Sequence, residues 1–299
     1  MADGIAFIDG KYVPSDEAKI SVFDLGFSRS DVAYDVVSTW KGLFFRLDDH
    51  VDRFLQSCAG VRIPCPYGKN DIQRILAECT YRAGLQDAYV EMLATRGHFR
   101  SLDVRDLRQT EPTFVAYAIP YVWIATPEKQ QVGLHVFIAK TPRIPDASVV
   151  ARYKNFHWGD LTRAQFEALD AGADVAVLCG VTGDLSEGPG FNIFFIKGER
   201  LFTPRINVLE GITRRTVLAL AEEIGIPVET GNYPADALRT ADEAFICSTA
   251  GGIMPVTIVD GKALGNGKPG PISWRLRELY WEKREAGWLG TPITNLLTK

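Results

Sequence analysis

The sequence predicts a two-domain α/β protein, and three observations support this fold class. Short strand patterns alternate with two helical patterns in the first 120 residues. Strands and helices alternate again after residue 131, and the stretch between carries Pro, Glu and Lys without a sustained period. We therefore expect a small N-terminal α/β domain at residues 1–120, an interdomain linker at 121–131 and a larger C-terminal α/β domain at 132–299.

Turn dipeptides and helical spacing define the elements of the first domain. Asp9-Gly10 and Lys41-Gly42 each separate two short apolar runs, which is the pattern of a β-hairpin. Apolar residues at helical spacing follow Asp48, which we expect to cap a helix, and a second helix should end at Gly84. The expected strands are 5–8, 11–13, 36–40, 43–46, 88–95 and 113–121, and the second helix is expected at 70–83.

The second domain continues the alternation of strands and helices. Its expected strands are 134–139, 174–178, 192–196, 244–247 and 256–259. Its expected helices are 158–170, 213–224 and 272–285. No internal repeat or low-complexity tract interrupts this order.

Composition favours a small-molecule enzyme. The 299 residues are 46% hydrophobic, enough to bury a large core, and the net charge of −4 gives no general attraction to nucleic acid or anionic membranes. The N-terminus lacks the regions of a signal peptide, and the longest largely apolar stretch, 244–259, is interrupted by Ser, Thr and Gly. We expect no nucleic-acid or membrane partner.

Five cysteines are odd in number and form no Cys-x-x-Cys pair. Neither a disulfide framework nor a metal site is therefore indicated. Free thiols and a cytoplasmic location are expected.

Two segments carry the chemistry. Residues 153–160 offer Lys154, and residues 185–192 offer Glu187. A pyridoxal phosphate enzyme needs an amine that binds the cofactor aldehyde as an imine and an acidic group that keeps the pyridine nitrogen protonated. A solvated lysine and a loop glutamate are the ordinary alternative for either residue taken alone.

Six blocks in order resemble the branched-chain-aminotransferase-like family of pyridoxal phosphate enzymes, called fold type IV. The likeness is strongest to its (R)-selective amine transaminases. The blocks are Phe44-Phe45-Arg46-Leu47-Asp48-Asp49-His50, Pro120-Tyr121-Val122-Trp123, Lys154-Asn155 with Trp158-Gly159-Asp160-Leu161, Glu187-Gly188 with Gly190-Phe191-Asn192, Gly211-Ile212-Thr213-Arg214, and Thr249-Ala250-Gly251-Gly252-Ile253-Met254-Pro255. The resemblance implies a two-domain fold of type IV with the active site between the domains, and a homodimer.

The resemblance also implies residues that bind pyridoxal 5′-phosphate. Lys154 and Glu187 are its catalytic residues, and Arg53 is the arginine that clamps the phosphate. The resemblance adds Leu209 on a face of the ring, and it adds these phosphate-binding residues: Ile212, Thr213, Ser248 and Thr249. Taken without the resemblance, Arg53 is a solvated partner of Asp49, Thr213 is a helix cap and Leu209 is ordinary core.

The arginines of the substrate pocket each have two interpretations. The resemblance places Tyr34, Val36, Trp158 and Ala250 along the pocket. Arg29 departs from the histidine of the amine transaminases and the tyrosine of the branched-chain enzymes, so it either binds a substrate carboxylate or lies exposed in a turn. Arg105 is the favoured loop arginine for the acceptor carboxylate, with exposed ion pairs to Asp103 or Asp106 as the alternative.

The expected activity is the transfer of an amino group from an (R)-amine, a D-amino acid or both to a keto acid such as pyruvate, by ping-pong kinetics through the Lys154 imine. Two alternatives within this fold are a lyase of the aminodeoxychorismate type and a branched-chain L-amino acid aminotransferase. A non-catalytic ligand-binding relative is the remotest alternative.

Overall fold

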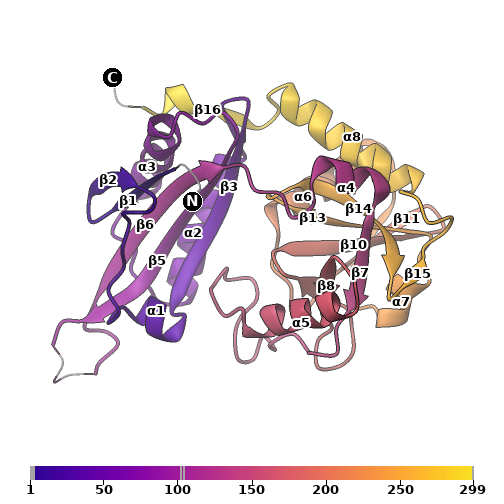
Figure 1. The fold of residues 1–299 in the computed structure, drawn as a ribbon, viewed down its shortest axis with the longest axis horizontal. Helices are drawn as coiled ribbons and strands as arrows, with labels where there is room; N and C mark the ends of the chain where they lie inside the picture. Colours follow the sequence, from indigo (N-terminus) through magenta and orange to yellow (C-terminus); the bar gives the residue numbers. More distant parts are fainter. Residues whose placement is uncertain (1–3, 102, 104, 298–299) are drawn as a thin grey trace. The chain divides into compact units, whose positions relative to one another are not determined.

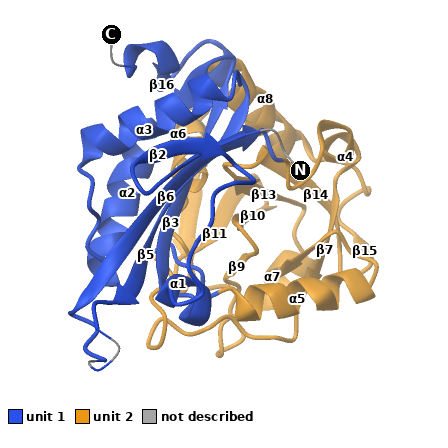
Figure 2. Ribbon diagram, turned by 60° about the vertical axis from the view of Figure 1, so that its left-hand side comes forward, with its two compact units in different colours: residues 1–122, 153–157, 284–299 blue, residues 123–152, 158–283 orange. Residues whose placement is uncertain are grey.

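The computed structural model describes residues 4–101, 103 and 105–297. It divides the chain into two compact units (Figure 2). Unit 1 comprises residues 1–122, 153–157 and 284–299, and unit 2 comprises residues 123–152 and 158–283. Each unit contains one β-sheet with helices (Figure 1), so the α/β class expected from the sequence is confirmed.

Unit 1 is built on an antiparallel sheet, which has seven strands within the described residues. In spatial order the strands are β16 (Gly290–Pro292), β4 (Leu43–Phe45), β3 (Val32–Trp40), β5 (Ala88–Phe99), β6 (Thr110–Pro120), β1 (Ile5–Ile8) and β2 (Lys11–Pro14). The helices are α1 (Leu25–Arg29), α2 (Leu47–Gly60), α3 (Lys69–Arg82) and the 3-10 turn η1 (Ile293–Asn295).

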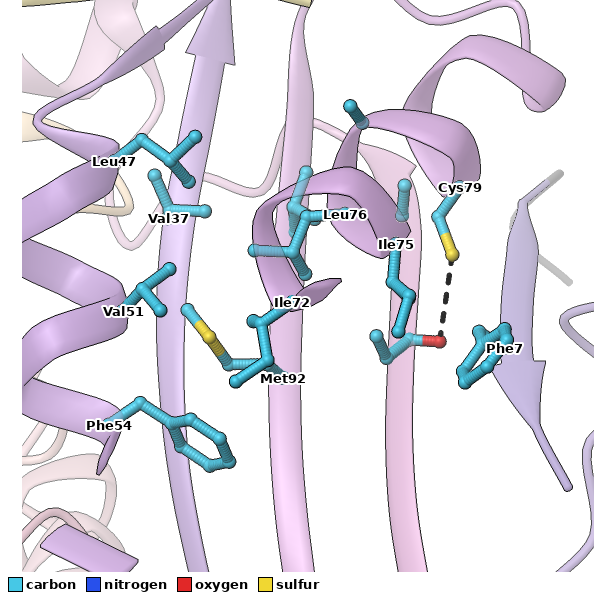
Figure 3. Packing of buried hydrophobic residues seen from close by; sticks show 14 of the residues in the cluster. Phe7, Val37, Leu47, Val51, Phe54, Ile72, Ile75, Leu76, Cys79 and Met92 are labelled. Atoms are coloured by element: carbon cyan, nitrogen blue, oxygen red, sulfur yellow. Dashed lines mark hydrogen bonds between the residues drawn. The ribbon is translucent and has the colours of Figure 1, made fainter. Parts of the chain in front are cut away.

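Helices α2 and α3 cover one face of this sheet and form its core (Figures 1 and 3). Val51 and Phe54 of α2 and Ile72 of α3 are fully buried, and the three share one apolar cluster with Met92 of β5. Side chains alternate between the two faces of a strand. The residues that alternate with this core on β3 and β5, among them Tyr34, therefore point to the opposite face.

Unit 2 is built on a mixed sheet. Its main path is β12 (Val228–Gly231), β11 (Arg200–Pro204), β10 (Phe191–Lys197), β13 (Glu243–Ser248), β14 (Gly252–Val259), β7 (Leu134–Ile138) and β8 (Val175–Val177); β9 (Glu187–Gly188) pairs with β10, and β15 (Lys262–Ala263) pairs with β14. The helices are α4 (Pro127–Val132), α5 (Gly159–Asp170), α6 (Ile212–Glu223), α7 (Ala235–Arg239) and α8 (Pro271–Glu285), whose last two residues fall in unit 1. Six consecutive residues of β10 are buried, as expected for a strand covered on both faces.

Three details differ from the sequence expectations. Helix α2 begins at Leu47 after Arg46, whose φ is 54° and whose side chain makes no capping bond, so Asp48 lies in the first turn and does not cap the helix. The expected linker contains α4, which Thr126 caps by accepting a bond from the Lys129 amide. The compact units also depart from the expected division at 121–131, because residues 153–157 and 284–299 pack with unit 1.

None of the described helices is long and apolar enough to cross a membrane.

Candidate active site

Lys154 is held in unit 1 by backbone bonds to β3 and α2. Its carbonyl accepts a hydrogen bond from the Tyr34 amide at 3.1 Å, and its own amide donates to Ser57 Oγ at 3.0 Å. The next residue, Asn155, forms a β-bridge with Ala33. These contacts fix the lysine backbone to a buried strand and to the last turns of a helix.

The ring of Tyr153 packs against Gly60 near the end of α2. A Cβ atom added at Gly60 would lie 2.3 Å from the ring Cζ, which no side chain tolerates. Gly60 therefore permits the close approach that seats residue 153, and with it Lys154, against α2.

The Lys154 amine lies against Tyr34. Nζ donates to the Tyr34 hydroxyl at 3.0 Å and lies 4.1 Å from the ring centre. Tyr34 is 4% exposed, and its ring packs edge-on against Phe156. The tyrosine therefore orients the amine, as expected of a side chain in a reactive lysine site. Val36 is buried two residues further along β3, on the same face as Tyr34.

Glu91 is a carboxyl group in unit 1 that the sequence interpretation did not select. It lies opposite Val36 on β5 and is 6% exposed. Its Oε2 accepts hydrogen bonds from the hydroxyls of Tyr89 at 3.1 Å and Tyr117 at 2.8 Å. Burial raises the pKa of Glu91 above its ordinary value, and the nearby charge of Lys154 opposes this rise. A glutamate between Val90 and Met92, in the mostly apolar first half of β5, was the signal in the sequence.

Arg53 points to β3 and belongs to a second group in unit 1, the Asp35 cluster of Asp35, His50 and Arg53. Arg53 donates to Asp35 through Nε at 2.7 Å and Nη2 at 2.8 Å, and His50 Nδ1 lies 2.8 Å from Asp35 Oδ1. Arg53 thus has a buried carboxylate partner, where the sequence alternative offered a solvated pair with Asp49.

Opposing effects set the protonation of this cluster. Burial raises the pKa of the fully buried Asp35, but Arg53 and the hydrogen bond with His50 lower it more, so the net pKa lies well below its usual range. Burial lowers the pKa of His50 below its ordinary value, although Asp35 opposes that shift. The cluster therefore holds an ionised aspartate, a cationic arginine and a neutral histidine near pH 7.

The two arginines assigned to substrate carboxylates are exposed in this chain. Arg29 ends α1, and its guanidinium lies 6.0 Å from the centre of the Phe99 ring. Arg105 lies in the loop between β5 and β6. In the same loop Arg108 pairs with Asp106 at 2.7 Å, an exposed contact of little energetic value.

Glu187 is fixed inside unit 2 as part of the Glu187 cluster of Arg143, Asp160 and Glu187. It lies on β9 and is 6% exposed. Its Oε2 accepts from the Leu209 amide at 2.8 Å, and its Oε1 accepts from Arg143 Nε at 3.2 Å. Arg143 also donates through Nη1 to Asp160 at 2.7 Å. Arg143 had no assigned role in the sequence interpretation, because Pro142 and Pro145 mark its segment as an ordinary loop.

Leu209 leads into the start of α6. Its carbonyl accepts a hydrogen bond from Asn192 Nδ2 at 2.9 Å, so Glu187 and Asn192 together fix both sides of this residue's backbone. Helix α6 follows with Gly211 as N-cap and no side-chain capping bond, while Ile212 and Thr213 are buried at its first positions. Thr213 is thus inside the helix and is not its cap.

The remaining expected residues of unit 2 lie at the turn between β13 and β14 or at the start of α5. Ser248 Oγ donates to the Gly190 carbonyl at 2.8 Å and accepts from the Ala250 amide at 3.2 Å. Thr249 is partly buried and Ala250 is buried. Trp158 is partly buried at the N-cap of α5.

These residues fit pyridoxal 5′-phosphate. In unit 1 the Lys154 amine is oriented by Tyr34, and the partly buried Arg53 is a cation. In unit 2, described by itself, Glu187 is an anchored carboxylate, and the start of α6 has no side-chain capping bond. A helix start of this kind suits a phosphate dianion.

Comparison with known proteins gives the family. The model of amino-transferase class IV matches residues 32–259. The chain belongs to the class IV aminotransferases. Enzymes of this class use pyridoxal 5′-phosphate, so the expected enzyme class and cofactor are confirmed.

Two curated relatives of this class IV aminotransferase have different names. The branched-chain-amino-acid aminotransferase of Pseudomonas aeruginosa is 29% identical over 94% of this chain and 92% of the relative. The D-alanine aminotransferase of Bacillus licheniformis is 30% identical over 89% of this chain and 92% of the relative.

A solved structure agrees with the fold. The branched-chain amino acid aminotransferase from Thermobaculum terrenum, in its PLP-form, has a TM-score of 0.86 and 27% identity, covering 98% of this chain and 99% of that chain. The expected type IV fold of the class IV aminotransferase is thus confirmed.

Proposed function

We propose that this class IV aminotransferase transfers an amino group from an (R)-amine, a D-amino acid or both to a keto acid such as pyruvate. The observation that carries the transfer chemistry is the Lys154 amine on the Tyr34 hydroxyl, and the blocks at 120–123 and 249–255 favour the amine transaminases over the branched-chain enzymes. The D-alanine aminotransferase of Bacillus licheniformis supports the D-amino acid part.

Lys154 and Glu187 have separate tasks in this proposal. When bound, pyridoxal phosphate supplies an electron sink for the charge left on the donor carbon. Lys154 would hold the cofactor at its aldehyde carbon, and its Nζ would also move the proton taken from the donor carbon. Tyr34 orients Nζ for that transfer. Glu187 holds the proton on the pyridine nitrogen.

The proposed phosphate-binding residues are those that offer N–H groups and positive charge. The amides of Ile212 and Thr213 donate from the start of α6, and Arg53 adds its guanidinium. Ser248 and Thr249 contribute from the turn after β13. Leu209, fixed through its backbone, would pack on a face of the ring.

Glu91 bears on the choice of donor. Its buried carboxyl group lies on the sheet face that carries Tyr34 and Val36, the expected pocket residues. Neither an ionised nor a protonated carboxyl group offers positive charge to a donor carboxylate, so this face favours a donor whose substituent is uncharged. A donor or acceptor carboxylate requires a cation elsewhere, for which Arg29 and Arg105 are the proposed candidates.

A donor panel tests the proposal. The panel pairs (R)- and (S)-1-phenylethylamine, D-alanine and L-leucine with pyruvate and with 2-oxoglutarate. Turnover of (R)-1-phenylethylamine or D-alanine with pyruvate is expected, and turnover of L-leucine alone contradicts the proposed donor class. Pyruvate release from aminodeoxychorismate without a keto acceptor reveals the lyase alternative.

A branched-chain L-amino acid aminotransferase is the second candidate. The names of the Pseudomonas aeruginosa and Thermobaculum terrenum proteins favour it. L-Leucine with 2-oxoglutarate is the pair in the panel that detects this activity.

We further propose that the enzyme acts as a homodimer in the cytoplasm. The dimer rests on the family resemblance. The location rests on the five cysteines, all free, which suit a reducing compartment.

A further inference from the structure

Asp160 closes the Lys-Asn-x-x-Trp-Gly-Asp block and has no role in the proposed function. It lies in the first turn of α5 and is 8% exposed. Its Oδ2 accepts from Arg143 Nη1 and from the Ile144 amide, both at 2.7 Å. Its Oδ1 is buried and has no hydrogen-bond partner within residues 4–101, 103 and 105–297. A buried oxygen without a donor is costly, so hydrogen bonding alone does not explain this carboxylate.

Arg143 connects Asp160 to Glu187. Its side chain is 7% exposed, and Nε and Nη2 each lie 3.2 Å from Glu187 Oε1. Burial lowers the pKa of Arg143, but Glu187 and Asp160 raise it more, so the net pKa is above its ordinary value. The guanidinium therefore stays cationic.

The charges of the Glu187 cluster do not cancel. One guanidinium faces two carboxylates, which gives a net charge of −1 in a place where water screens charges poorly. A protonated pyridine ring carries +1 and neutralises this group. Without Asp160, Arg143 and Glu187 would form a neutral pair, and the same guanidinium would oppose a positive ring.

We propose that Asp160 is a positioning residue that neutralises Arg143, so that Glu187 acts on the cofactor pyridine nitrogen as a net anion and keeps it protonated. This inference rests on the proposed function, in which Glu187 holds that nitrogen. Asp160 acts through Arg143 and Glu187.

Three variants test the proposed effect of the net charge of the Glu187 cluster. Asp160→Asn preserves size and the acceptor for the Ile144 amide but leaves the cluster neutral. Arg143→Met leaves two buried carboxylates together. The double variant Arg143→Met/Asp160→Asn restores a net charge of −1 on Glu187 alone. Asp170→Asn, an exposed change on the same helix, is the matched control for charge.

The main measurement is the ¹⁵N chemical shift of ring-labelled pyridoxal phosphate in each reconstituted enzyme, because this shift reports protonation of the pyridine nitrogen. Asp160→Asn is expected to lower the protonated fraction and to slow both half-reactions about ten- to a hundredfold. The double variant is expected to recover most of both losses. Asp170→Asn is expected to match the wild type.

A structural ion pair predicts a different result. The ring shift would then stay at its wild-type value in Asp160→Asn, and the change would appear in the unfolding midpoints of the cofactor-free proteins, with Arg143→Met lowest because it leaves two buried carboxylates without a cation. A ring shift unchanged by Asp160→Asn, or a double variant no better than Asp160→Asn, overturns the inference.

Glu187→Gln separates this inference from the proposed function. If Glu187→Gln lowers ring protonation but Asp160→Asn does not, only the role of Asp160 fails. If the wild-type ring is unprotonated, or Glu187→Gln changes nothing, the proposed role of Glu187 fails and the role of Asp160 fails with it.

Discussion

Unit 1 and unit 2 each hold an arginine against buried carboxylate groups, and the two clusters differ in charge. The Asp35 cluster pairs Arg53 with one aspartate and a neutral histidine, which sums to zero. The Glu187 cluster pairs Arg143 with two carboxylates, which sums to −1. The two clusters thus provide two electrostatic environments, and the number of carboxylates decides which charge each one suits.

The proposed function uses this difference. A neutral cluster that presents a guanidinium suits the dianionic phosphate, whereas an anionic cluster suits a protonated ring. Variants in each unit therefore have distinguishable effects.

The largest effect is expected from Lys154→Ala, because neither the Asp35 cluster nor the Glu187 cluster contains an amine that could replace it. Turnover and the near-visible absorbance of covalently bound cofactor should both disappear, because Lys154 is the amine proposed to bind the aldehyde. Absorbance spectra before and after borohydride give the measurement. Lys140→Ala and Lys197→Ala are the controls, and borohydride fixation at either lysine in the Lys154→Ala protein contradicts the assignment.

Arg53→Met should destabilise unit 1 more than any surface change. Asp35 is fully buried, and a buried carboxylate that loses its cation costs about 3–5 kcal/mol. Urea unfolding of the cofactor-free protein measures this loss of stability. The affinity of the protein for the cofactor, and the part of it that depends on the phosphate, is a second readout. The exposed pair of Arg74 and Asp71 supplies the control, since Arg74→Met should cost about 1 kcal/mol or less.

The free energy of unfolding should fall as the pH is lowered, because of the protonation of His50. Burial lowers the folded-state pKa of His50, so below the ordinary value of 6.5 the unfolded chain binds more protons and is favoured. His50→Asn should flatten the stability profile from about pH 7 to about pH 5. Asp35 adds a separate loss below its ordinary pKa of 3.8, because its folded-state pKa is lowered. An equally steep profile in His50→Asn refutes the assignment.

The smallest effect is expected at the exposed arginines. Arg29→His should weaken D-alanine as donor by a few-fold and spare (R)-1-phenylethylamine, because one exposed ion pair is worth about 1 kcal/mol or less. Values of kcat/KM for both donors, beside those of Arg105→Ala, give the comparison. A proportional drop for both donors, or no drop in Arg29→His, removes Arg29 from carboxylate binding.

Helical spacing predicted α2 and α3 closely because each buries one continuous stripe against a sheet. The family pattern selected Lys154 and Glu187. It did not select Asp35, Glu91 or Arg143, whose partners are distant in the sequence. Their pairing depends on strand register and loop folding, which single-sequence patterns do not encode.

Helix α4 was missed although Thr126 and Pro127 at its start are visible signals. Strand β16 was missed for a different reason. Its three residues have no strand pattern of their own, and they become a strand only by pairing with β4.

The segment 153–157 limits how the gene can be divided. It brings Lys154 into unit 1, yet Arg152 and Trp158 on either side of it belong to unit 2. A recombination breakpoint after residue 122 would separate the Asp35 cluster from Lys154. Lys154 is nevertheless hydrogen-bonded to β3, the strand that carries Asp35. The two compact units are therefore not exchangeable modules, and an N-terminal fragment must extend to residue 157 to carry the whole 153–157 segment together with the Asp35 cluster.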